Sequence, residues 1–375
     1  MSVRSTHLPA ALCIAAMLIV ALAAPSDQSI LPVAGVGSAA AAAAGGEGGI
    51  STLPPGISPS VERAIQSGLR YLANTQGSDG DWRARGAFGG HPVAMTSLAG
   101  LAFLSAGNTP TEGPYARNVR MALTYVLRNA NPNTGLIANV AEEGSKSMYA
   151  HGYAMLFLAE AYGMESDPRN QEQIRRALQR AVRLSQDSQS TLGGWYYTPD
   201  STNDEGSVTI TQVQGLRAAR NAGILVSKQT MDNAIGYLEK SANPDGGIRY
   251  TARSAGGSLP AITAQAVAAL YNAGSYDHPL APRALRFLED RMRGGDIARA
   301  FGGHRSYSMF YASQAFYLSG DERWNRFFPQ LRSHLLDTQA TNGSWPGDFV
   351  GETYGTAIAV MCLSLPYNHL PIFQR

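Results

Sequence analysis

Three histidines stand where helices are expected to begin, and imidazole is the side chain best suited to acid–base chemistry near neutral pH. The run Ala-Phe-Gly-Gly-His occurs twice, ending at His91 and at His304, and His151 holds a similar place in a third segment. Imidazoles gathered on one rim could coordinate a metal or act as acid and base. Alternatively, each histidine only hydrogen-bonds the start of its helix, and we assign no metal site.

The acidic pair Asp204 and Glu205 is a second candidate for chemistry, because it immediately precedes an expected helix that starts at Ser207. A carboxyl group in this position can serve as a general acid or base. It can equally cap the helix by accepting hydrogen bonds from the first backbone N–H groups. Both interpretations stay open from the residues alone.

A repeated turn indicates the elements that must position these residues. The spacing Gln-x-x-x-Gly-x-Trp occurs at residues 76–82, 189–195 and 339–345, and it contains three of the four tryptophans. A pattern that recurs along a chain indicates a repeat architecture. In such a turn the tryptophan would cover the joint between helices with a large apolar surface and one N–H donor.

Each of these turns separates an amphipathic outer helix from an inner helix that has no polar face, and glycine-containing turns at residues 133–135, 245–247 and 302–304 do the same in the other three hairpins. In the first repeat Val61, Ile65, Leu69 and Leu72 share one helical face, whereas residues 93–106 are apolar or small on all sides. The expected outer helices are residues 61–72, 115–129, 171–186, 228–241, 280–291 and 322–337, and the inner helices are residues 93–106, 148–162, 207–222, 260–273, 306–318 and 353–363.

Inner helices that are buried on every side favour a closed ring over an open solenoid, which would leave one face in water. We therefore predict an all-α protein, an α6/α6 toroid with concentric rings of inner and outer helices. Its parallel inner helices would gather their N-termini on one rim of a central cavity. The positive ends of their dipoles would favour an anionic or electron-rich ligand there.

Composition and the N-terminus limit the classes of function. The 375 residues are 44% hydrophobic and 15% charged, and a net charge of +2 gives no support for a nucleic-acid partner. Residues 1–23 have the layout of a signal peptide, residues 24–57 form an Ala/Gly/Pro-rich linker, and residues 58–375 form the folded domain. The chain is therefore expected to be exported, periplasmic or secreted, with no transmembrane segment after cleavage.

The three Gln-x-x-x-Gly-x-Trp turns resemble the QW motif of the squalene cyclase and prenyltransferase repeat family, and the resemblance covers the chain after the linker. It implies an α/α toroid whose cavity holds polyprenyl chains. Class II triterpene cyclases of this family carry Asp-x-Asp-Asp-Thr, in which the middle acid protonates an alkene. Aligning Ser207 with that threonine puts Glu205 at the acid position, with Asp204 beside it, but Asn203 and Gly206 replace the flanking acids.

Other activities of related toroids find less support. Zinc protein prenyltransferases use Asp, Cys and His ligands, but Cys362, the one cysteine outside the predicted signal peptide, has no histidine beside it. The thioester signature Gly-Cys-Gly-Glu-Gln of complement-type domains is absent from the sequence. We expect no cofactor and no disulfide framework.

The first two turns of the inner helices, together with the central turn, should line the cavity. An aromatic, Met and Thr/Gln lining suits an elongated apolar ligand. The candidate lining residues are Met95, Tyr149, Trp195, Tyr196, Thr211, Gln212, Thr263, Gln265, Tyr307, Phe310, Tyr311 and Tyr354.

The leading hypothesis is an exported toroid with incomplete catalytic motifs that binds an isoprenoid-like or other elongated ligand, or a protein partner. One alternative is a class II-type terpenoid cyclase that uses Glu205 as general acid. The other is a carbohydrate-active toroid enzyme that uses His91, His151 or His304, since toroids of this shape host such enzymes. Whether the chain is an enzyme stays open.

Overall fold

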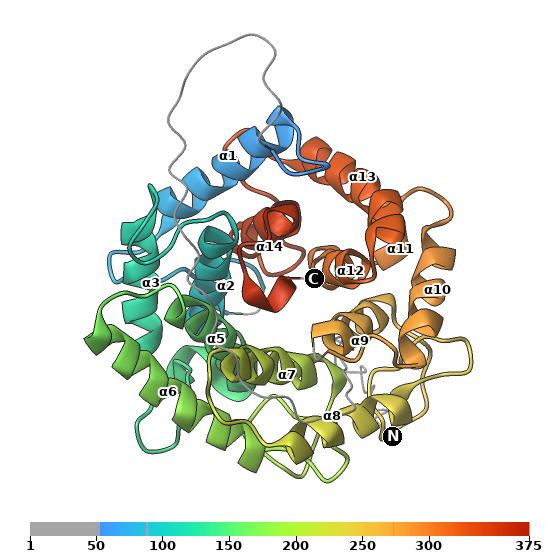
Figure 1. Ribbon diagram of the computed structural model, residues 1–375, viewed down its shortest axis with the longest axis horizontal. Helices are drawn as coiled ribbons and strands as arrows, with labels where there is room; N and C mark the ends of the chain where they lie inside the picture. The colour runs from blue at the N-terminus through green and yellow to red at the C-terminus, as the bar shows by residue number, and fades with distance from the viewer. Residues whose placement is uncertain (1–52, 88, 273, 375) are drawn as a thin grey trace, which may run out of the picture.

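The computed structural model describes residues 53–374, except 88 and 273, as two concentric rings of α-helices (Figure 1). An all-α toroid is therefore confirmed, while the predicted signal peptide and most of the predicted linker lie outside the described residues. The outer helices are α1 (Pro59–Thr75), α3 (Ala116–Arg128), α6 (Pro168–Asp187), α8 (Lys228–Ser241), α10 (Leu280–Met292) and α13 (Asp321–Thr338), and the inner helices are α2 (Pro92–Ser105), α5 (Ser147–Tyr162), α7 (Gly206–Asn221), α9 (Pro260–Asn272), α12 (Arg305–Leu318) and α14 (Glu352–Ser364).

Short helical pieces complete the described chain. They are α4 (Val140–Glu143), η1 (Gly144–Lys146), α11 (Ile297–Phe301), η2 (Leu365–Tyr367) and η3 (Pro371–Phe373). Within the described residues, no helix combines the length and apolar character that crossing a bilayer requires. The end of the predicted linker already packs on the ring, because Ile57 is buried and the Gly56 carbonyl accepts a hydrogen bond from Arg332.

The two rings differ in how much of each helix they bury. Helix α1 buries one stripe that includes Val61, Ile65 and Leu69, whereas all fourteen residues of α2 are buried. The same contrast separates α6 from α5, since α5 is covered on all sides by α2, α6 and α7. Burial of apolar surface between the rings is therefore the main force that holds the toroid together.

The three tryptophan turns join the first hairpin to the second, the third to the fourth and the sixth to the first. In the central turn the Trp195 indole is fully buried, and its Nε1–H donates to the Ser185 carbonyl over 2.6 Å. Gln189 Nε2 donates both to the Gly193 carbonyl within the turn and to the Thr230 carbonyl of α8. Trp82 and Trp345 make the equivalent indole bonds over 2.8 and 2.6 Å.

The last turn closes the ring on the first helix. Gln339 Nε2 donates to the Ala64 carbonyl of α1 over 3.0 Å. Gly343 has φ +89°, and a Cβ there would lie 2.5 Å from the Ser67 carbonyl oxygen, so only glycine allows this close approach. The joint that links neighbouring hairpins thus also links the sixth hairpin to the first, which closes the circle.

The C-terminal segment enters the centre of the inner ring, where Figure 1 places the end of the chain. Helix η3 packs against α7, and the Phe373 ring meets the Phe310 ring edge-on at 6.1 Å. Leu370 and Ile372 are buried in the same segment. This segment fills the centre of the ring beside Phe310 of α12, where the sequence placed a cavity lining.

Candidate functional site

A cavity of about 140 Å³ lies among the N-terminal halves of α2, α5, α12 and α14. Its wall combines Met95 and Leu98 of α2 with tyrosine side chains from the other three helices. We call it the tyrosine cavity, after Tyr149, Tyr153, Tyr307 and Tyr354. Three of these tyrosines and Met95 are lining residues expected from the sequence, and Tyr153 is an addition.

The tyrosines form one packed group. The Tyr307 and Tyr311 rings lie 4.8 Å apart on successive turns of α12, and the hydroxyls of both residues are buried without a hydrogen-bond partner among the described residues. Burial raises the pKa of Tyr307 and Tyr311 well above the usual value, and that of Tyr153 to about 12. All three phenols are therefore protonated at neutral pH and can donate hydrogen bonds.

The mouth of the cavity carries ionisable groups. His91, Lys146 and His304 precede α2, α5 and α12, and all three line the cavity together with Asp348. The Asp348 carboxylate accepts from the backbone N–H groups of Arg305 (3.2 Å) and Ser306 (3.0 Å), and burial raises its pKa. Here the structure does bring two of the three candidate histidines to one site.

Phe349 covers part of this mouth. Its side chain is 56% exposed, and its ring meets the His304 imidazole edge-on at 6.3 Å. The carbonyls of Phe349 and Val350 accept hydrogen bonds from the Ala87 and Gly86 N–H groups, so the loop is held against the first repeat.

His151 lies elsewhere, fully buried between α5 and α6. Its Nδ1 accepts from the Ile137 N–H over 3.0 Å, and its Nε2 lies 3.1 Å from the Ser185 hydroxyl and 3.2 Å from the Ala181 carbonyl. Burial lowers its pKa to about 4, so the imidazole is neutral. The three histidines do not form one cluster, and no group of metal ligands occurs within the described part of the chain.

Glu205 caps helix α7 rather than facing the cavity. Its Oε1 accepts from the Val208 N–H (2.5 Å), and its Oε2 accepts from the N–H (2.7 Å) and the hydroxyl (2.5 Å) of Ser207. Burial raises the pKa of this carboxyl to about 8 despite these bonds. Of the two sequence interpretations, the geometry therefore fits the helix cap.

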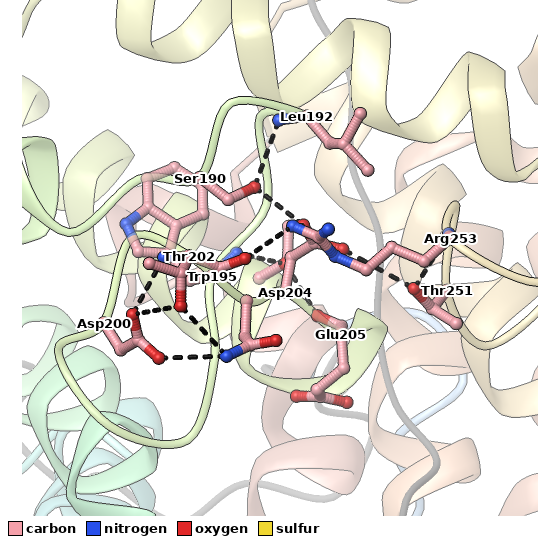
Figure 2. Close-up of polar contacts among 11 residues, drawn as sticks. Ser190, Leu192, Trp195, Asp200, Thr202, Asp204, Glu205, Thr251 and Arg253 are labelled. Carbon is pink, nitrogen blue, oxygen red and sulfur yellow. Dashed lines mark hydrogen bonds and ion pairs between the residues drawn. The ribbon is translucent and has the colours of Figure 1, made fainter.

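Asp204 points away from Glu205 and ties the third turn to the fourth, as Figure 2 shows. Its buried carboxylate accepts from the Ser190 hydroxyl (2.8 Å) and from Arg253 Nη2 (2.5 Å). Thr251 Oγ1 lies 3.5 Å from the other carboxylate oxygen. A charge held in this way is a structural ion pair.

A hydrogen-bonded chain nevertheless connects Glu205 to the cavity. The Ser207 hydroxyl, which donates to Glu205, also bonds the Tyr149 hydroxyl, and Tyr149 lines the cavity. The Tyr197 and Tyr250 hydroxyls lie 2.6 Å apart next to this group. Sequence reasoning missed both tyrosines, although they follow Trp195 and Ile248 two residues later in equivalent turns.

Acids outside the inner helices, one from α4 and one from a loop, cap two other inner helices. Glu143 accepts from the Val93 N–H (2.8 Å) and the Ala94 N–H (3.0 Å) of α2, and burial raises its pKa to about 7. Asp348 does the same for α12. The chain's own carboxylates therefore already occupy the N-termini of α2, α7 and α12, where we expected an anionic ligand.

The remaining expected lining residues do not contact the cavity. Gln212, for example, bonds the Met148 carbonyl and the Ser185 hydroxyl between α5 and α7, and Thr263 accepts from the Ile248 N–H. These residues lie in helix contacts or joints, namely Trp195, Tyr196, Thr211, Gln212, Thr263, Gln265, Phe310 and Tyr311.

Comparison with known proteins identifies the fold. No family model and no curated protein matches this sequence. The type II terpene cyclase MstE from Scytonema is similar in structure, with a TM-score of 0.55 at 16% identity over 83% of this chain and 99% of the cyclase. A variant of that cyclase was solved with its substrate, geranylgeranyl dihydroxybenzoate.

Carbohydrate-active enzymes are as similar as the cyclase. An alpha-1,6-mannanase of Salegentibacter has a TM-score of 0.58 at 9% identity, covering 82% of this chain and 99% of the mannanase. The cellobiose 2-epimerase from Spirochaeta thermophila has a TM-score of 0.58 at 12% identity, covering 83% of this chain and 98% of the epimerase. The chain thus shares the α/α-toroid fold with both enzyme classes, and the fold does not decide between them.

Proposed function

We propose that this toroid binds an apolar, isoprenoid-like molecule in the tyrosine cavity, outside the cytoplasm, without protonating it through Glu205. The observation that carries the proposal is the cavity itself. Ala94, Met95 and Leu98 face tyrosine rings near the centre of the double ring. Concave sites lined by apolar and aromatic side chains, with few polar groups, are typical of apolar ligand binding.

The size of the cavity limits what enters it. A volume of about 140 Å³ is close to that of an engineered apolar cavity of about 150 Å³ that binds benzene. The site therefore takes one ring or one branched end of a longer chain. The rest of an elongated ligand would pass through the mouth beside His91, His304 and Phe349.

The surroundings of Glu205 argue against a cyclase. Alkene protonation needs a strong acid, whereas burial raises the pKa of Glu205 to about 8. Both carboxylate oxygens accept hydrogen bonds from the start of α7, and this carboxyl meets the cavity only indirectly, through the hydroxyls of Ser207 and Tyr149. Asp204 is paired with Arg253 and cannot strengthen the acid.

A carbohydrate-active enzyme is the second candidate, favoured by the imidazoles of His91 and His304 at the same mouth as Asp348. His151 would take no part, because it is buried between α5 and α6. A sugar ring needs several polar partners, while the cavity below the mouth is mostly apolar and aromatic. Ligand binding therefore fits the geometry better.

The test is mass spectrometry of an organic extract from the protein, purified from the exported fraction of its native cell. We expect a stoichiometric apolar ligand, lost from Ala94→Met, which fills the cavity, and kept by Ala255→Met, whose site is exposed. An empty wild-type extract contradicts binding, and equal ligand in Ala94→Met contradicts this location. A cyclised product that disappears in Glu205→Gln would instead establish the cyclase.

A further inference from the structure

Two tyrosine hydroxyls in this site find no hydrogen-bond partner among the described residues. Tyr307 lines the tyrosine cavity, and Tyr311 lies one turn further along α12. Both hydroxyl oxygens are buried and unpaired. Since buried polar groups in native proteins are almost always hydrogen-bonded, such a pair needs a specific explanation.

Tyr153 brings a third hydroxyl from the facing helix α5. It lines the cavity, and its hydroxyl interacts with those of Tyr307 and Tyr311, although neither of these two is placed for a well-formed hydrogen bond. Burial keeps all three phenols protonated at neutral pH, so each of them has a proton to donate. Two of these donors, Tyr153 and Tyr307, line the cavity, and Tyr311 lies next to them outside its lining.

The wall that α2 contributes to the cavity offers these donors no acceptor. Its residues Ala94, Met95 and Leu98 carry no side-chain oxygen or nitrogen. The acidic and basic residues that line the cavity, namely His91, Lys146, His304 and Asp348, lie at its mouth. At the buried end an anion would be disfavoured, because an apolar wall strips a charge of its water. The missing partner is therefore a neutral acceptor.

From this geometry we propose that the tyrosine cavity recognises one neutral oxygen acceptor on its ligand, a carbonyl or an ether. Tyr307 and Tyr153 donate to that oxygen, and Tyr311 supports Tyr153 from behind. The inference rests on the proposed function, because it concerns the ligand of the same cavity. The ligand is then an apolar molecule with a single oxygen placed at its buried end.

The test compares two ring-sized probes of nearly the same shape, cyclohexanone and methylenecyclohexane, in ligand-observed NMR titrations of the whole chain at pH 7. We expect the ketone to bind about tenfold more tightly, the effect of one to two net hydrogen bonds. Tyr307→Phe should reduce that ratio to less than about twofold and leave hydrocarbon binding intact. Tyr237→Phe, which removes a buried hydroxyl outside the cavity, should keep the ratio.

Each other outcome has a definite meaning. Equal affinity of the wild type for both probes overturns this inference and leaves apolar binding standing, whereas no binding of either probe overturns the proposed function as well. A preference that survives Tyr307→Phe also overturns it. If near-ultraviolet circular dichroism shows that Tyr307→Phe is misfolded, Tyr153→Phe takes its place with the same expected loss.

Discussion

The backbone N–H of Ile137 donates to Nδ1 of His151 over 3.0 Å, where sister repeats use a threonine hydroxyl. In each case the donor is the residue at the tryptophan position of the turn. The equivalent bonds, of 2.9 to 3.0 Å, are Trp82 to Thr96, Trp195 to Thr209, Ile248 to Thr263 and Trp345 to Thr356. His151 is therefore one member of a series of acceptors that hold these joints together, although its residue type and its place near the start of an inner helix made it resemble a site residue.

The loss of stability on replacing His151 should depend on whether the new side chain can accept the hydrogen bond from the Ile137 N–H. His151→Ala leaves the Ile137 N–H buried without a partner and opens a cavity, so we expect a loss of about 3 kcal/mol. His151→Thr can restore the acceptor of the sister repeats, and its loss should be less than half as large. Urea unfolding at pH 7 measures both variants. Equal losses would contradict the equivalence of these positions.

Because of His151, the stability of the folded protein should also fall at acidic pH. Burial lowers the pKa of His151 to about 4, from about 6.5 in an unfolded chain. The unfolded state therefore binds a proton first, and stability falls as pH falls from 6.5 towards 4, by about 3 kcal/mol. Urea unfolding of wild type and His151→Thr at pH 7 and pH 4.5 isolates the contribution of His151. The carboxyl groups titrate alike in both proteins, so their effect cancels when the two pH dependences are compared. Parallel pH profiles would show that His151 is not buried neutral.

Glu160 should have the opposite dependence. It is buried on α5 with Oε2 unpaired, and burial raises its pKa to about 8 despite a backbone hydrogen bond from Ile372. The folded state keeps the proton longer than the unfolded state, so its contribution is full below about pH 4.5 and is lost as pH rises through 8. Glu160→Gln should thus gain about 4 kcal/mol over wild type between pH 4 and pH 8.5. A pH-independent difference would contradict this.

The fold could be predicted because the same turn motif recurs along the sequence. The residues of the site could not all be predicted, because they depend on how each inner helix is rotated about its own axis. An inner helix such as α2 or α5 is apolar on all sides, so its sequence does not indicate which face meets the axis. Tyr149 and Tyr307 line the cavity, but Gln212 of α7 points to α5 instead. Tyr153 could have been found, because it follows Tyr149 by four residues and shares its face.

The central joint depends on a glycine in the left-handed region. Gly193 has φ +102°, and a Cβ there would lie 2.0 Å from the Asn233 carbonyl oxygen, whereas Gly223, at φ +82°, has open space around it. We expect Gly223→Ala to cost about 1 kcal/mol, the effect of backbone strain alone. Gly193→Ala should cost at least about 3 kcal/mol, since α8 must also move away. Similar melting temperatures for the two variants would show that the joint is looser than described.

Removing the unpaired hydroxyl of Tyr311 should make the protein more stable. The hydroxyl is buried without a hydrogen-bond partner among the described residues, and such a group costs about 1–3 kcal/mol of folding free energy. Tyr311→Phe keeps the ring contacts with Tyr307 and Phe310 and should gain about 1 kcal/mol in urea unfolding. Tyr237→Phe is a matched control for stability alone, because its hydroxyl is also buried and unpaired among the described residues but lies near Asp204, whereas Tyr311 lies beside Tyr153 and Tyr307. Both variants should be more stable than wild type, but only Tyr311→Phe should also weaken the preference for cyclohexanone. This result is expected if the Tyr311 hydroxyl lowers stability but contributes to ligand binding.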